Sequence, residues 1–262
     1  MGKNKLSKFD DMEGYPNVLQ YPFGRLEAEG FALKGFWSSR FFGNSHPVVV
    51  ELGCGKGEYT LELGRRFPDI NFIGVDIKGA RLWSGAKASN DEGLTNVAFL
   101  RTHVELITRF FAGGEVSEIW LTFPDPQMKK SNRRLTSPRF MSMYRCILTD
   151  GGLIHLKTDS GFMYGYTLSL ARANGITVVR DIDDIYGAGM IDGADTLSIR
   201  TYYEQQWLER GMTIKYLSLL RPETDALVEP DVTISPDAYR SFGRNRRLEA
   251  TPRAGYQHSN LQ

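Results

Sequence analysis

The sequence VVVELGCGKGEYT, residues Val48–Thr60, constrains the fold more than any other stretch of this chain. Three β-branched residues lead an apolar run, and Gly53, Gly55 and Gly57 then alternate with other residues before a helical pattern begins. Glycine allows a sharp backbone turn and a close approach to a ligand, and a helix amino terminus favours an anionic group. The stretch therefore favours a nucleotide-type cofactor over a structural strand-to-helix turn, although glycines mark plain turns as well.

Two familiar phosphate-binding loops differ from this one. The dinucleotide fingerprint G-x-G-x-x-G/A has a small third residue where this chain has Glu58, which disfavours a nicotinamide dehydrogenase. The P-loop requires Ser or Thr after Gly-Lys, whereas Lys56 is followed by another glycine. An acid two positions before the first of three alternate glycines, here Glu51, resembles instead the cofactor loop of class I S-adenosylmethionine (AdoMet) methyltransferases.

The composition is that of a globular protein, with 41% hydrophobic and 24% charged residues and a net charge of +1. A polyanion would therefore have to bind at a local basic patch. Cys54 and Cys146 have no metal-site spacing and the four histidines add no zinc motif, so we expect no metal. Because no signal peptide and no apolar run of transmembrane length are visible, we expect a soluble cytoplasmic protein without a membrane partner, either a monomer or a homodimer.

Short apolar runs alternate with helical patterns through most of the chain. The predicted strands are Val48–Leu52, Asn71–Asp76, Asn96–Leu100, Val116–Phe123, Gly152–Lys157, Ile176–Arg180 and Thr213–Leu220. The runs are nearly continuous, as in strands buried on both faces, so we predict an α/β fold with a doubly wound, mostly parallel sheet. This domain would span residues 48–220, with an aromatic-rich arm, residues 1–47, packed against it. The tail, residues 221–262, would be weakly packed or disordered, at least beyond Arg240.

In a doubly wound sheet, ligands bind at the carboxyl ends of the strands, so the residues that follow each apolar run are candidates for a site. Glu51 and the glycines follow the first run. Asp76 ends the second, where an acid can accept hydrogen bonds from ribose hydroxyls or cap the next helix; beside a glycine loop, the ribose role is favoured. His103 follows the third run. It either contacts adenine or simply begins its helix, which is the safer interpretation of this residue alone.

The fourth run ends in the most unusual stretch, FPDPQMKKSNRR, residues Phe123–Arg134. Two prolines flank Asp125, which nearly fixes the backbone and aims the carboxylate. The cations that follow are Lys129, Lys130, Arg133 and Arg134. Two prolines alone can mark a turn, and a charge run is usually a solvated face. Their combination at the carboxyl end of a buried strand favours a substrate site.

Five motifs together resemble the bacterial tRNA (guanine-N7-)-methyltransferases of the TrmB family. They are ELGCGKGEYT, GVDIKGAR, IWLTFPDPQMKK, GGLIHLKTD and TYYE, which occur in the family's order and spacing across residues 48–220. The FPDP stretch followed by basic residues is the specific element, because most class I methyltransferases share the glycine loop. The resemblance implies a Rossmann-like class I fold with a seven-stranded sheet, AdoMet as the cofactor, and methylation of N7 of guanosine 46 in the variable loop of tRNA.

The resemblance also implies roles for individual residues. AdoMet contacts would come from Glu51, Gly53, Gly55, Asp76, His103 and Asp125, of which Asp125 is also the active-site acid. Contacts with tRNA or the target base would come from Lys129, Asp159, Thr201, Tyr202, Tyr203 and Glu204. Two positions depart from the family: Gln127 stands where Trp is common, in a basic run without His, and His103 stands where Asp is common. These departures concern base stacking and the adenine contact.

The chemistry of the residues agrees with such a reaction. Guanine N7 carries a free lone pair, so its attack on a sulfonium methyl needs no general base, and alignment of the two groups would supply most of the catalysis. The aimed carboxylate of Asp125 would stabilise the positive charge that passes to the purine. The basic run that ends at Arg134 would bind phosphates and position the tRNA.

Structural alternatives stay open for two of these segments. Asp159 can also cap the helix that starts near Gly161. Thr201-x-x-Glu204 fits a capping box with Gly211 as the helix stop, which is the stronger interpretation from sequence alone. Two rival functions also remain. A methyltransferase for small molecules or proteins leaves the basic run without a role, and the intact cofactor residues argue against a non-catalytic RNA-binding module.

Overall fold

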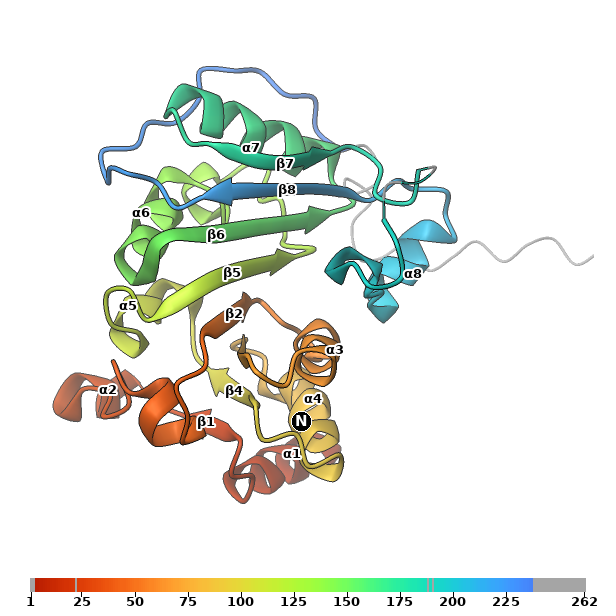
Figure 1. Cartoon of the computed structure of the whole chain (residues 1–262). Coiled ribbons are helices and arrows are strands. Elements are labelled where there is room, and N and C mark those ends of the chain that lie inside the picture. The colour runs from red at the N-terminus through yellow and green to blue at the C-terminus, as the bar shows by residue number, and fades with distance from the viewer. Residues whose placement is uncertain (1–2, 22, 188, 190, 238–262) are drawn as a thin grey trace, which may run out of the picture.

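An eight-stranded sheet forms the centre of the protein (Figure 1). The structure is a computed structural model that describes residues 3–21, 23–187, 189 and 191–237. The strands are β1 (Val18–Gln20), β2 (Val48–Leu52), β3 (Asn71–Val75), β4 (Val97–Arg101), β5 (Val116–Thr122), β6 (Leu148–Thr158), β7 (Val178–Ile182) and β8 (Lys215–Leu220). Their spatial order is β1-β4-β3-β2-β5-β6-β8-β7, and β8 is antiparallel to both neighbours. The order reverses between β2 and β5, which is where doubly wound sheets bind ligands.

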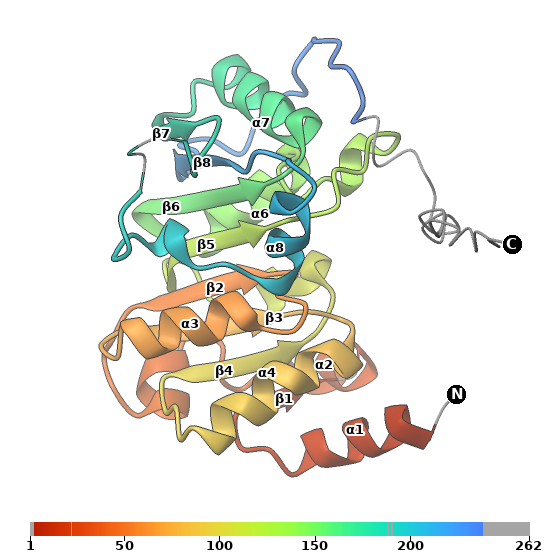
Figure 2. The ribbon, with the colours of Figure 1, turned by 90° about the vertical axis from the view of Figure 1, so that its right-hand side faces the viewer.

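Helices cover both faces of this sheet. They are α1 (Lys3–Glu13), α2 (Phe23–Glu29), α3 (Glu58–Arg66), α4 (Gly79–Asp91), α5 (Ile107–Phe110), α6 (Pro138–Ile147), α7 (Gly161–Ala173) and α8 (Tyr202–Leu208). α3 and α4 contribute Tyr59 and Leu82 to one hydrophobic cluster, whereas α6 and α7 contribute Phe140 and Met163 to another. Figure 2 shows α3 and α4 on the near side of the sheet. The predicted doubly wound α/β fold is therefore confirmed.

The sheet has one strand more than the predicted seven, and that strand comes from the amino-terminal arm. Val18–Gln20 pairs in parallel with β4 and places Val18 opposite Phe99. Most of the arm's aromatic residues pack against the rest of the protein, as predicted, whereas Phe23 and Phe36 are exposed. Trp37 is fully buried in a π-helical turn and stacks on Phe111 with ring centroids 5.4 Å apart. The arm thus contributes to the core as well as to the sheet.

The first part of the tail, residues 221–237, runs beside α7 (Figure 1). The Tyr166 hydroxyl on α7 donates a hydrogen bond to the Glu229 carboxylate at 2.6 Å. The Asp237 carboxylate accepts a hydrogen bond from the Phe162 amide at 3.0 Å and is itself buried. This packing was not predicted from the sequence. The stretch beyond Arg240 that was expected to be disordered lies outside the described residues.

The described ranges also bear on membranes and metals. No helix in them combines the length and the apolar character needed to cross a lipid bilayer. In the same part of the chain, no three His, Cys, Asp or Glu side chains gather where they could hold a metal ion. Both cysteines are free thiols, Cys54 buried and Cys146 exposed.

Candidate active site

The glycine loop joins β2 to α3 at the point where the strand order reverses. Gly53, Gly55 and Gly57 have φ values of 79°, 60° and 72°, a conformation that other residues rarely adopt. A Cβ on Gly57 would lie 2.5 Å from the Phe99 ring, so this glycine is required for packing. A Cβ on Gly53 or Gly55 would meet nothing within 4 Å. The first two glycines thus border open space that a cofactor can occupy, while the third completes the core.

Glu51 joins three elements beneath the loop. Its buried carboxylate accepts hydrogen bonds from the Thr60 amide at 2.9 Å, from the Thr60 hydroxyl, and from the Thr122 hydroxyl at 2.5 Å. Burial raises the pKa of Glu51 to about 7, although the hydrogen bonds from Thr122 and Thr60 oppose this shift. Glu51 therefore holds α3 and the end of β5 together, and its carboxyl changes charge near neutral pH.

Two further predicted cofactor contacts, Asp76 and His103, follow β3 and β4. Asp76 accepts hydrogen bonds from the Gly55 amide at 3.0 Å and from the Lys78 amide at 2.7 Å, so it contacts both the glycine loop and the turn before α4. His103 is exposed, and its carbonyl accepts a hydrogen bond from the Leu106 amide at 3.0 Å to begin a 3₁₀ turn. The helix-start interpretation of His103 is confirmed, and its contact with adenine stays a prediction.

The backbone is strained on both sides of Asp125. Phe123 and Gln127 have φ values of 50° and 46°, and no other non-glycine residue in the described ranges has a positive φ. Such conformations cost about 1–3 kcal/mol each and cluster at functional sites. The Gln127 amide donates to the Asp125 carboxylate at 3.1 Å, and the Phe123 amide donates to the Lys157 carbonyl at 2.8 Å. Asp125 is therefore an exposed acid on a fixed turn at the carboxyl end of β5.

The four cations after this turn divide into two kinds. The exposed ones are Lys129, Lys130 and Arg133. Arg134 is buried; its guanidinium donates to the Met128 carbonyl at 3.0 Å and lies 4.3 Å from the centre of the Tyr166 ring. The side chain thus joins the turn to α7, and the phosphate-binding role of Arg134 stays a prediction.

The segment Thr201–Glu204 begins α8 beside the end of β5 (Figure 1). The predicted capping box is confirmed: the Thr201 hydroxyl accepts from the Glu204 amide at 3.1 Å, and the Glu204 carboxylate accepts from the Thr201 amide at 3.4 Å. Tyr202 and Tyr203 are 61% and 41% exposed. The Tyr203 ring meets the Phe123 ring edge to face, with centroids 5.7 Å apart. Both tyrosines thus reach solvent near the Asp125 turn, and their contact with the target base stays a prediction.

Two predicted substrate contacts are instead buried within the protein. Glu204 is fully buried, pairs with the Lys157 ammonium at 2.8 Å and accepts a hydrogen bond from the Tyr186 hydroxyl at 2.6 Å. Asp159 is only 1% exposed. Their contact with tRNA stays a prediction. The alternative role of Asp159 as a helix cap is wrong, because Ser160 is the N-cap of α7.

Sequence reasoning did not single out three residues that build the site, namely Thr60, Thr122 and Lys157. A signal was present for Lys157, because a cation within the apolar run GGLIHLK must be buried and therefore paired. The threonines carry no such local signal. Their role depends on Glu51, and Thr122 is 71 positions away from it along the chain.

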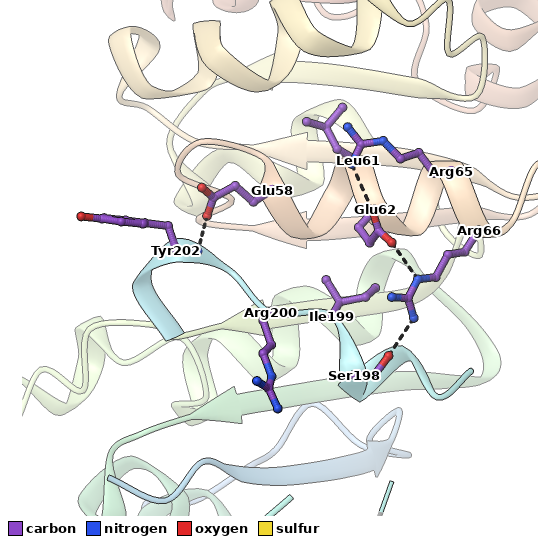
Figure 3. A pocket seen from close by; sticks show the side chains of 9 residues that line it. All are labelled: Glu58, Leu61, Glu62, Arg65, Arg66, Ser198, Ile199, Arg200 and Tyr202. Atoms are coloured by element: carbon purple, nitrogen blue, oxygen red, sulfur yellow. Dashed lines mark hydrogen bonds and ion pairs between the residues drawn. The ribbon is translucent and has the colours of Figure 1, made fainter. Parts of the chain in front are cut away.

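A pocket of about 420 Å³ lies between α3 and residues 198–202 (Figure 3). Hydrogen bonds join its two sides: the Arg66 guanidinium donates to the Ser198 hydroxyl at 2.9 Å, and the Tyr202 amide donates to the Glu58 carboxylate at 2.9 Å. Of the predicted site residues, Tyr202 alone lines this pocket. The pocket is therefore formed where the segment before α8 packs against α3.

The fold is similar to that of solved methyltransferases. The structure of the 16S rRNA methyltransferase KamB aligns with a TM-score of 0.53 and 13% identity, covering 78% of this chain and 95% of that one. A 30S ribosomal A1408 methyltransferase from an uncultured bacterium gives a TM-score of 0.51 and 14% identity over the same shares of the two chains. At this level of identity, the likeness concerns the fold alone.

Sequence comparisons are more specific. Residues 45–217 match the Methyltransf_4 family, described as "Putative methyltransferase". A tRNA (guanine-N(7)-)-methyltransferase of Porphyromonas gingivalis is 59% identical over 92% of this chain and 100% of its own length. The protein of the same name from Bacteroides thetaiotaomicron is 57% identical over 94% of this chain and 97% of its own. This chain therefore belongs to the TrmB family of bacterial tRNA (guanine-N7-)-methyltransferases.

Proposed function

We propose that this protein transfers a methyl group from AdoMet to N7 of guanosine 46 in the variable loop of tRNA, in the cytoplasm. One observation carries the proposal beyond family membership. The exposed Asp125 sits on a doubly strained turn, and exposed aromatic residues at the start of α8 lie beside that turn. A carboxylate held in a fixed direction beside exposed aromatic rings can bind a planar base that carries hydrogen-bond donors on one edge. The exposed cations beyond Asp125 favour a nucleic acid over a small molecule.

The residues of the glycine loop fit the cofactor. Gly53 and Gly55 leave open space above the backbone, and the acidic residues Glu51 and Asp76 surround the loop. When bound, AdoMet would supply a methyl group on a positively charged sulfonium. Asp76 would hold the ribose hydroxyls, and Glu51 would place negative charge beneath the loop. His103, at the end of the neighbouring strand β4, would lie toward the adenine.

The remaining side chains would act on the nucleoside. Asp125 accepts a hydrogen bond from guanine N1–H or from the exocyclic amine and so turns N7 toward the methyl group. Its carboxylate also stabilises the positive charge that develops on the purine. Tyr202 and Tyr203 offer ring faces for stacking of the extruded base. The phosphates on either side would bind to the exposed cations Lys129, Lys130 and Arg133.

The test uses purified protein, labelled AdoMet and unmodified tRNA transcript, followed by chemical cleavage at 7-methylguanosine. We expect one cleavage site in the variable loop, and none when guanosine 46 is replaced by adenosine. Asp125→Asn should bind AdoMet within about threefold of wild type while losing most of the transfer rate. Label on the tRNA without cleavage, or cleavage outside the variable loop, would contradict the proposal.

A further inference from the structure

Lys157 is a fully buried lysine at the carboxyl end of β6. Its ammonium donates to the Leu197 carbonyl at 3.0 Å, to the Ile199 carbonyl at 2.7 Å and to the Glu204 carboxylate at 2.9 Å. A lysine has three N–H donors, so the partners in the protein satisfy all of them. The side chain therefore fixes both the approach to α8 and the first turn of that helix.

The backbone of the same residue holds the opposite side of the site. The Lys157 carbonyl accepts the hydrogen bond of the Phe123 amide at 2.8 Å, where the strained turn around Asp125 begins. The Phe123 ring then contacts the Tyr203 ring on α8. A continuous chain of contacts thus joins the turn that carries Asp125 to the exposed tyrosines. It runs through Phe123, Lys157, Glu204 and Tyr203.

Other contacts keep the segment before α8 attached to the protein. The Tyr59 hydroxyl donates to the Thr196 carbonyl at 2.8 Å, and the Arg66 guanidinium holds Ser198 as described above. These hydrogen bonds join the segment to α3, on the side of the predicted cofactor site, and neither of them involves the Asp125 turn. Loss of the Lys157 ammonium would therefore leave α8 attached to α3, while its position relative to that turn would depend on the weaker Phe123–Tyr203 ring contact.

We propose that Lys157 is a positioning residue for the target nucleoside: through Glu204 and the Leu197 and Ile199 carbonyls, it sets the separation between Tyr202–Tyr203 and Asp125. The inference rests on the proposed function, because the base is taken to bind between these groups. A buried ion pair is a poor source of stability, since apolar residues of similar size often serve as well. The three directed hydrogen bonds of the Lys157 ammonium are better suited to fixing the position of a helix end.

The first experiment compares Lys157→Met with Asn96→Leu. Asn96 is the matched control because its side chain also donates hydrogen bonds to three carbonyls, those of Gly64, Phe67 and Ile70. It precedes β4, at the amino edge of the sheet, away from the site. We expect Lys157→Met to reduce kcat/KM for tRNA on the order of 30-fold, with AdoMet affinity changed less than about threefold. Asn96→Leu should change both by less than about threefold.

Lys157→Met leaves the Glu204 carboxylate buried without its cation, so the double variant Lys157→Met/Glu204→Gln is measured in parallel. If the double variant folds and still shows the tRNA defect, loss of folding is not the cause. Equal kcat/KM for the double variant and Asn96→Leu would overturn the inference. A wild-type protein that makes no 7-methylguanosine would instead overturn the proposed function, so the two failures are distinguishable.

The dependence of kcat/KM on pH distinguishes a positioning role from a merely structural one. Burial lowers the pKa of Lys157 to about 8, while the charge of Glu204 opposes this shift. Arg200 and Asp195 also act on the ammonium, which lies over the Tyr59 ring, and the Tyr186 hydroxyl donates to its partner Glu204. In the wild type, kcat/KM for tRNA should fall above about pH 8 as the ammonium loses its proton. Glu204→Gln keeps the capping-box geometry but removes the opposing charge, so the fall should begin at lower pH. An unchanged profile would contradict the inference.

Discussion

The amide of Gly55 donates a hydrogen bond to the carboxylate of Asp76 across 3.0 Å, which joins the loop after β2 to the acid that ends the next strand. The glycine loop and Asp76, which the sequence indicated separately as cofactor residues, are therefore joined by a hydrogen bond. A change in either residue should disturb the other, because the same carboxylate also fixes the turn before α4 through the Lys78 amide.

Asp76→Ala should weaken AdoMet binding by at least about tenfold, because it removes the acceptor of the Gly55 amide as well as the expected ribose contact. Titration calorimetry with AdoMet measures the change. The control is Asp91→Ala, which removes an exposed acid near the end of α4 that pairs with Lys87. If both variants bind AdoMet like the wild type, Asp76 has no part in the site.

Gly53→Ala and Gly57→Ala should have different consequences, although each carries a penalty of about 1–2 kcal/mol for a positive φ. At Gly57 the new methyl group also collides with the Phe99 ring, which should add about 1–3 kcal/mol to the loss in the free energy of unfolding. At Gly53 the methyl group enters open space, so the main loss should be in AdoMet affinity. Urea unfolding and AdoMet titration of both variants separate the effects; equal loss of stability would contradict this assignment.

The contribution of Glu51 to the stability of the protein without cofactor should fall between pH 4.5 and about pH 7, because burial raises the pKa of Glu51 to about 7. In this interval the folded state holds a proton that the unfolded state has released, so the free energy of unfolding decreases as pH rises. The full effect is about 3 kcal/mol from this group. Glu51→Gln should remove this part of the slope, measured by urea unfolding at several pH values.

AdoMet should bind more tightly at pH 8 than at pH 6, because its positive charge favours the ionised form of Glu51. Glu51→Gln should lose this dependence, and it is the control for other titrating groups. A wild-type affinity that is constant across this range would show that the Glu51 charge does not act on the cofactor.

Neutralisation of the basic stretch should give two separable results. Lys129→Ala/Lys130→Ala/Arg133→Ala should leave the melting temperature unchanged. It should also reduce the slope of log affinity for tRNA against log salt by about 0.7–0.9 per lost phosphate contact. Arg134→Ala should instead lower stability by about 2 kcal/mol, because it removes a buried cation from the Tyr166 ring and the Met128 carbonyl. A reduced salt slope at wild-type stability would instead show that Arg134 binds phosphate.

The sequence was informative where the physics is local. Apolar runs mark buried strands, alternate glycines mark a loop with positive φ, and Thr201-x-x-Glu204 marks a helix start whose partners lie three positions apart. The prolines around Asp125 likewise restrict the backbone wherever they occur. These features hold in any tertiary context, and the structure retains all of them.

Contacts between segments distant in the sequence could not be predicted from local patterns. The pairing of Val18–Gln20 with β4 joins residues about 80 positions apart, and no local pattern in so short a segment indicates it. Arg134 and Glu204 were predicted to contact tRNA, and their burial was not predicted because their partners come from distant segments. The sequence by itself determined the doubly wound sheet, the glycine loop and the aimed acid. Only the tertiary structure decided which charges are exposed and which are buried against a partner, because burial of a charge depends on neighbours that folding brings from elsewhere in the chain.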